Sequence, residues 1–259
     1  EKNTLNGDGT PANPYQITCA ADFILIDEQP TAHYQIVNDI DFGDAPFAGL
    51  QKPFAGALDG GNHVISHLFL NGCGLFREVV DTARIFNISI HEPVLALSRR
   101  TTYAGIIANT MRGGFTDDGV ELHAYLNNIL VQSPMIIGND FAGVCGGLIG
   151  EASLFVEMSQ CAVLNAEMIE VPNAEQLGGL VGAMHTSSSM NVAAFSGRLA
   201  GGALVGGVAA MVDGDCPVTN THINAQITGL TTVGGVVGTS ERAQVANCFV
   251  EGTITLYRA

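Results

Sequence analysis

Four glycine pairs recur along the second half of this sequence, and each is followed by two apolar residues. They are Gly146-Gly147, Gly178-Gly179, Gly206-Gly207 and Gly234-Gly235. The second glycines of successive pairs are 32, 28 and 28 residues apart. A period of this length is typical of repeat architectures, in which each unit buries its apolar face by stacking on its neighbours. The chain is therefore expected to form a stack of similar coils.

A second landmark follows the glycine steps, most often after twelve or thirteen residues, and it is usually a polar amide. The positions are Asn87, Asn128, Gln160, Val192, Asn220 and Asn247. Asn128 comes about ten residues late, and two of the six positions lack Asn. Six coils therefore share one pattern: a glycine-led apolar step, a turn and a short strand. Amides stacked at an inward-facing corner would form a hydrogen-bonded ladder.

The runs between these landmarks are short, rich in β-branched and small residues, and bounded by Gly, Asn, Asp or Ser. Such runs indicate strands and turns rather than amphipathic helices. Three strands and three turns fill a coil of about 28–32 residues, and successive coils would stack about 4.8 Å apart. We therefore expect an all-β fold, a right-handed parallel β-helix, because crossovers between parallel strands are almost always right-handed.

The pattern predicts a single domain over residues 1–259. Residues 1–70 would hold a lead-in segment and the first rungs, and residues 71–259 the six glycine-led coils. An inserted loop at about 109–125 explains the late landmark in one coil. No apolar run approaches the roughly eighteen residues that a membrane-spanning helix needs, so the chain is not expected to span a membrane.

Three segments resemble a known family. Residues 54–65, FAGALDGGNHVI, are similar to a stretch of bacterial surface proteins with GLUG-type repeats. Residues 6–17 and 34–42 resemble the lead-in segment and the first rung of those β-helices. The resemblance implies a secreted or cell-surface bacterial protein. It also implies an adhesin or scaffolding module that binds glycans or cell surfaces without catalysis, or a passive spacer of a longer surface protein.

The charge balance limits the class of partner. The chain has 10 basic and 25 acidic residues, for a net charge of −15. Nucleic acid is not expected as a partner, because binding it depends on clustered Lys and Arg. Acidic polysaccharides are disfavoured for the same reason. The one basic pair, Arg99-Arg100, is interpreted as a solvated turn.

One polar column is the best catalytic candidate. Six positions beyond the second glycine, three consecutive coils carry His185, Asp213 and Glu241. A histidine beside carboxylates can act as a general base or hold a metal. The alternative function is therefore a polysaccharide hydrolase or lyase of the pectate-lyase-like β-helix class. The column falls in a turn of variable length, where polar residues are ordinary. The sequence therefore favours a protein without catalytic activity but does not decide whether it is an enzyme.

The inserted loop is the candidate binding site, because an insertion projects from one face of a solenoid and such loops often carry recognition. Its binding candidates are Arg112, Phe115, Asp117, Asp118, Glu121 and His123. The expected partner is a glycan or a host or neighbouring cell surface. A Ca²⁺ loop beginning at Asp117 is an alternative, but the ligand pattern of an EF-hand does not follow it. No cofactor is therefore expected.

Six cysteines are spread along the chain without the spacing of a zinc site. Cys161 and Cys248 share an offset three coils apart, too far to form a disulfide, so most cysteines are expected to be free. The last strand, residues 245–257, lacks an obvious capping helix. Terminal repeats usually need caps. We therefore expect either further chain beyond Ala259 or association of this end with another subunit.

Overall fold

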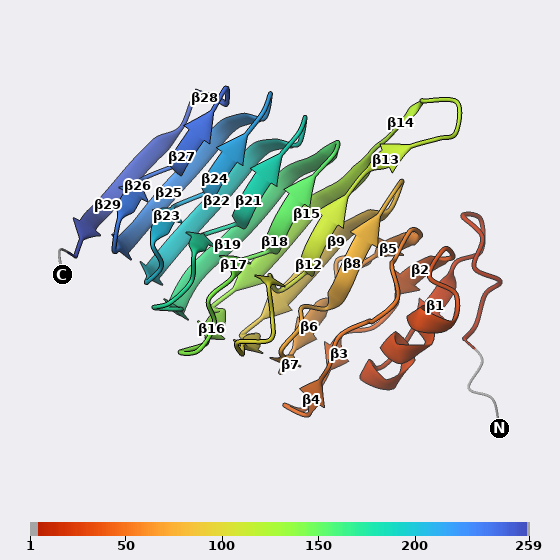
Figure 1. The fold of residues 1–259 in the computed structure, drawn as a ribbon. Coiled ribbons are helices and arrows are strands. Elements are labelled where there is room, and N and C mark those ends of the chain that lie inside the picture. The colour runs from red at the N-terminus through yellow and green to blue at the C-terminus, as the bar shows by residue number, and fades with distance from the viewer. Residues whose placement is uncertain (1–4, 258–259) are drawn as a thin grey trace.

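The computed structural model describes residues 5–257, which form a parallel β-solenoid (Figure 1). Successive coils lie side by side along one axis, from the N-terminal end to the C-terminal end. Strands at like positions pair in parallel across neighbouring coils, since each coil repeats the same turns at nearly the same offsets. The expected all-β fold, parallel pairing and coil length are confirmed.

Three parallel sheets surround a shared apolar core. The largest has sixteen strands: β1 (Tyr15–Ile17), β2 (His33–Ile36), β3 (Ile40–Asp41), β4 (Pro46–Phe47), β5 (Ala57–Asp59), β6 (Val64–Ser66), β7 (Phe69–Asn71), β9 (Arg84–His91), β10 (Val94–Ala96), β15 (Ala124–Gln132), β16 (Met135–Ile137), β19 (Val156–Glu170), β22 (Ser189–Ala200), β25 (Pro217–Gly229), β28 (Gln244–Ala246) and β29 (Phe249–Leu256). The second contains β11 (Tyr103–Ala104), β17 (Val144–Gly146), β20 (Gln176–Gly178), β23 (Leu204–Gly206) and β26 (Thr232–Gly234). The third contains β8 (Phe76–Val80), β12 (Ala108–Arg112), β18 (Ile149–Ser153), β21 (Val181–His185), β24 (Ala209–Asp213) and β27 (Val237–Glu241).

The glycine pairs form a column along the solenoid, as the sequence predicts. Their first members are in register across the second sheet, at Gly146, Gly178, Gly206 and Gly234. The second members stack in the same way: a Cβ atom on Gly179 would overlap the carbonyl oxygen of Gly207. Close backbone approach between coils therefore requires glycine here.

The second landmark is a column of residues with left-handed backbone. Its φ values lie between 54° and 57°. Its members are Asn87, Asn128, Gln160, Val192, Asn220 and Asn247. Asn tolerates this conformation better than most residues do. The side chains of Asn128 and Asn220 are exposed, so the expectation of an inward-facing ladder is wrong. Apolar neighbours such as Ile129 fill the core at this corner instead.

The two ends of the stack differ. Near the N-terminus, the 3-10 helix η1 (Ala20–Glu28) buries Phe23 and Ile26. Phe23 packs against Phe42 with the ring centroids 5.3 Å apart. In the last coil, by contrast, Val250 and Ile254 are 39% and 51% exposed. One end is therefore covered by the chain itself, whereas apolar surface lies open at the other.

The inserted loop forms an antiparallel hairpin, β13 (Gly114–Phe115) and β14 (Glu121–Leu122), which projects from the solenoid (Figure 1). The insertion is narrower than the expected 109–125, because both flanks of that range belong to the coil strands β12 and β15. Residues 113–123 leave the coil. In the next coil, Leu154 and Phe155 alone bridge the same gap.

Candidate functional site

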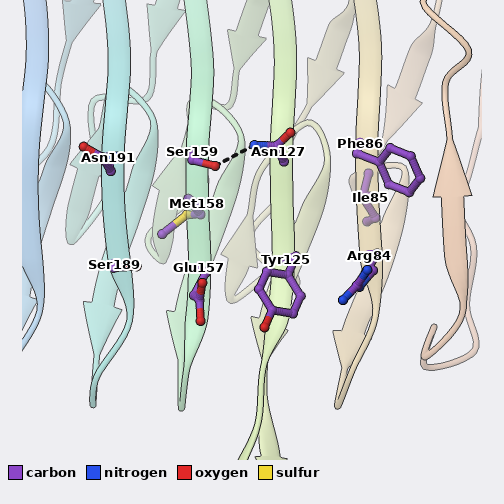
Figure 2. A pocket seen from close by; sticks show the side chains of 10 residues that line it. All are labelled: Arg84, Ile85, Phe86, Tyr125, Asn127, Glu157, Met158, Ser159, Ser189 and Asn191. Atoms are coloured by element: carbon purple, nitrogen blue, oxygen red, sulfur yellow. Dashed lines mark hydrogen bonds between the residues drawn. The ribbon is translucent and has the colours of Figure 1, made fainter.

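The outer face of the largest sheet carries a groove of about 600 Å³ over strands β9, β15, β19 and β22 (Figure 2). We call it the aromatic groove. Its lining residues are Arg84, Ile85, Phe86, Tyr125, Asn127, Glu157, Met158, Ser159, Ser189 and Asn191. Ile85 and Met158 are buried and belong to the floor. The remaining eight side chains come from outward positions of four consecutive coils.

The register of the strands aligns these outward positions in two rows along the solenoid axis. One row holds Arg84, Tyr125, Glu157 and Ser189, and the other holds Phe86, Asn127, Ser159 and Asn191. Side chains alternate between the two faces of a strand, so both rows point away from the core. Each row also contains one small residue, Ser189 in the first and Ser159 in the second, and these serines leave the hollow beside the larger side chains of β9 and β15.

Tyr125 is the central aromatic residue of the groove. Its half-buried ring appears nearly face-on in Figure 2, between Arg84 and Glu157. The Arg84 guanidinium carbon lies 5.0 Å from the ring centroid, a cation–π contact. Phe86 adds a second ring one row away. Aromatic rings beside a few polar groups are the usual composition of a small-molecule site.

Several polar groups in the groove keep open hydrogen-bonding capacity. The Asn127 Nδ2 atom donates to Ser159 Oγ over 2.6 Å, which leaves the Asn127 Oδ1 atom without a protein donor among residues 5–257. Asn191 Oδ1 accepts from Asn220 over 2.7 Å and from Thr219 over 3.0 Å, whereas its amide N–H groups donate to no acceptor in the same range. An amide offers both donors and an acceptor. The groove can therefore meet a ligand that carries both hydroxyl donors and acceptors.

His123 joins the hairpin to the aromatic groove. Its Nδ1 atom lies 2.6 Å from Glu157 Oε1, and its Nε2 atom lies 3.3 Å from Glu121 Oε2. The imidazole also stacks on Phe155, with ring centroids 5.2 Å apart. Phe115 packs edge-on against the Phe155 ring, with the ring centroids 5.2 Å apart. The hairpin root is thus packed against one end of the groove.

The other predicted binding residues lie farther along the hairpin or away from the groove. Asp117 and Asp118 occupy the exposed turn at its tip. Arg112 lies at the end of β12 and forms an ion pair with Glu78, with Nε and Oε1 3.1 Å apart. Within residues 5–257, no group of three or more His, Cys, Asp or Glu side chains is arranged to hold a metal ion.

The predicted catalytic residues do lie in adjacent register positions. His185 pairs with Asp213, and Asp213 pairs with Glu241. The imidazole sits between Asp213, 3.9 Å away, and Glu151, 3.7 Å away. Glu151 was missed by the sequence pattern because its register position lies beside Ala183 rather than beside His185. Both separations exceed hydrogen-bond length, and the three predicted residues do not line the aromatic groove.

All six cysteines are free thiols in the structure, in line with the sequence expectation. Burial raises the pKa of both Cys145 and Cys161 to about 12. These two thiols therefore pack as core residues. The described chain contains no helix with the length and apolar character of a membrane span.

Comparison with known proteins supports the fold. A family model for the GLUG motif matches residues 229–255. The resemblance to GLUG-repeat proteins is thereby confirmed, in the last coil rather than at residues 54–65. Halomucin from Haloquadratum walsbyi is 30% identical over 172 residues, which is 57% of this chain and 2% of halomucin. The chain thus spans a very small part of that relative's length.

Two solved structures share the architecture. One, from Bacteroides ovatus, is described as a candidate immunoglobulin A1 protease, and it matches with a TM-score of 0.77 at 21% identity over 97% of this chain and 79% of that one. The other is described as an IgA1 protease and matches with a TM-score of 0.69 at 16% identity over 93% of this chain and 19% of that one. At these identities the likeness concerns the fold alone.

Proposed function

We propose that this chain is a secreted or cell-surface module that binds neutral glycan chains in the aromatic groove, without catalysis. The observation that carries the proposal is the half-buried Tyr125 ring in one groove with Asn127 and Asn191, whose amides keep unused hydrogen-bonding groups. A sugar presents an apolar C–H face and a rim of hydroxyl groups. The ring can pack on the face while the amides bind the rim.

The shape of the groove favours an extended ligand over a single small molecule. Its lining residues come from four coils, stacked about 4.8 Å apart along the axis. An oligosaccharide that lies along the axis would meet a new pair of outward side chains at each coil. The net charge of −15 favours a neutral chain over a polyanionic one.

The comparisons support an extracellular setting for this role. The GLUG motif at residues 229–255 agrees with the resemblance of this chain to bacterial surface proteins. A solenoid with a GLUG motif is suited to present one long face to the surroundings. A host or neighbouring-cell glycan is therefore the partner we propose.

The test is an array of neutral oligosaccharides, followed by calorimetry on the best ligand with the wild-type chain and two variants. Tyr125→Ala should weaken binding about tenfold, equivalent to about 1.4 kcal/mol. Phe249→Ala is the matched control, because Phe249 is exposed on β29 of the same sheet, outside the groove. Equal binding by wild type and Tyr125→Ala would refute the aromatic groove as the glycan-binding site. No binding to any glycan would favour the passive spacer.

A further inference from the structure

A second groove, of about 640 Å³, lies between β8, β12 and the connection from β10 to β11. We call it the arginine groove. It shares no lining residue with the aromatic groove. It brings together Arg77 and Arg100, which are far apart in the sequence and come from neighbouring coils. Two of the ten basic residues of a chain with a net charge of −15 thus line one hollow.

Within the described part of the chain, neither of these arginines forms an ion pair. No carboxylate lies within 4.0 Å of the Arg77 or Arg100 side chain among residues 5–257. Among the described lining residues Glu78 is the one carboxylate, and it forms an ion pair with Arg112 at 3.1 Å. Two like charges that share a hollow repel each other unless an anion joins them. A negatively charged group would therefore be bound favourably between them.

The remaining lining is rich in hydroxyl and amide groups, among them Asn71, Thr102 and Tyr103. The floor is held in place by Asn109, whose Oδ1 atom accepts from the Gly74 N–H over 2.9 Å and whose Nδ2 atom contacts the Cys73 sulfur at 3.5 Å. Burial raises the pKa of Cys73 to about 11. The thiol thus stays protonated at neutral pH, and the groove offers binding groups rather than a nucleophile.

From this geometry we propose that the arginine groove binds the carboxylate of an acidic sugar residue, with Arg77 and Arg100 on the carboxylate and the amides and hydroxyls on the sugar ring. A planar guanidinium matches a carboxylate with two parallel hydrogen bonds. The overall charge opposes a polyanion such as nucleic acid, whereas a single carboxylate needs only these two cations. The inference does not depend on the role of the aromatic groove.

The test measures binding of two acidic ligands to the full chain by NMR titration: N-acetylneuraminic acid methyl glycoside and a galacturonic acid disaccharide. Their methyl esters, which lack the charge, serve as neutral counterparts. Binding of one acid and not the other identifies the sugar source. We expect each bound acid to bind at least tenfold more tightly than its ester. Equal affinity of acid and ester, or no binding of either acid, would overturn the proposal.

Variants then assign the site. Arg77→Gln and Arg100→Gln should each weaken acid binding about tenfold, and Arg100→Lys should weaken it less because the charge remains. Arg99→Gln is the matched control: it removes the same charge from the neighbouring residue, which does not line the groove. An equal loss in Arg99→Gln and Arg100→Gln would show a general charge effect and contradict the assignment. Tyr125→Ala, made in the other groove, should leave acid binding unchanged.

Discussion

Asn128 donates a hydrogen bond from Nδ2 to Oδ1 of Asn87, its counterpart one coil earlier, over 2.9 Å. Both residues have left-handed backbone, with φ of 54° and 57°. Asn87 in turn donates to Asp59 Oδ1 over 3.0 Å. Hydrogen bonds between side chains thus connect successive coils at this outer corner, where the left-handed backbone turns the side chains toward solvent. The residue type at this position should therefore affect stability directly.

Val192 breaks this column. Its φ is 54° and its side chain is 48% exposed, although β-branched residues are rarely found with positive φ. Val192→Asn should raise the free energy of unfolding by about 1 kcal/mol, by relieving strain of the order expected for such backbone. Urea denaturation measures it. Val192→Thr keeps the β-branch and should give no comparable gain, so equal stabilisation by both variants would contradict the strain argument.

The pair of His67 and Asp41 should make stability depend on pH. The His67 Nδ1 atom lies 2.9 Å from Asp41 Oδ1, and this hydrogen bond raises the pKa of His67 above its ordinary 6.5. Two hydrogen bonds lower the pKa of Asp41: the one from the Gly43 N–H has the larger effect, and the one from His67 the next largest. The stabilisation of the fold by protonated His67 is fully present below pH about 6.5. It is lost as the pH rises through the pKa of His67 in the folded state. The Asp41 contribution is present above pH about 3.9 and is lost as the pH falls through its folded pKa.

An NMR titration of the His67 ring checks this coupling. Asp41→Asn should return the His67 pKa toward 6.5. Asp44→Asn should lower it by less, because Asp44 acts only through charge and ranks below Asp41 among the causes. A His67 pKa that is insensitive to Asp41→Asn would contradict the pairing.

The cysteines should divide into reactive and protected thiols. Cys19 is exposed and Cys248 is half-buried, whereas the other four are buried. In the native chain a maleimide should label Cys19 first and Cys248 more slowly, because thiol reactivity requires access and thiolate character. Mass spectrometry after timed labelling measures the order. Cys19→Ser should remove the fast phase, and labelling of Cys145 at a similar rate in folded protein would be inconsistent with the buried core.

A chain of residues 1–259 on its own should self-associate through its last coil. The last coil exposes Val250 and Ile254, and one edge of β29 pairs with no strand among residues 5–257. Such edges pair readily with other chains. Light scattering should show a mass that rises with protein concentration. Ile254→Glu should suppress the rise, whereas Ile24→Glu, at an even more exposed site on η1, should not. A constant monomer mass for the wild type would contradict this prediction.

Much of the architecture follows from the sequence because the coils repeat. The glycine steps fix where neighbouring backbones approach closely, and this alone aligns Gly179 with Gly207. The same register brings His185 beside Asp213. The spacing could not predict that the side chains of the left-handed column point outward. An offset gives the place of a residue in the stack of coils but not the side of the sheet to which its side chain points.

The two grooves carry no sequence motif. Phe86 and Tyr125 are separated by the whole hairpin insertion, and Arg77 and Arg100 lie on different elements of neighbouring coils. Each residue alone reads as an ordinary outward position. The aromatic groove depends on the side-chain sizes of adjacent coils, which place Ser159 and Ser189 in the same rows as larger side chains. Those sizes can be compared only once the pairing of strands is known.

The hairpin shows how this scaffold can vary. Residues 113–123 leave the stack after Arg112 and rejoin it at Ala124, and pairing with the next coil continues on both sides. Because Leu154 and Phe155 close the same gap in the next coil, loops of very different length fit one corner. The coil thus tolerates insertions here, and exchange of the loop at this corner would give related chains a different projecting surface while the stack beneath stays the same.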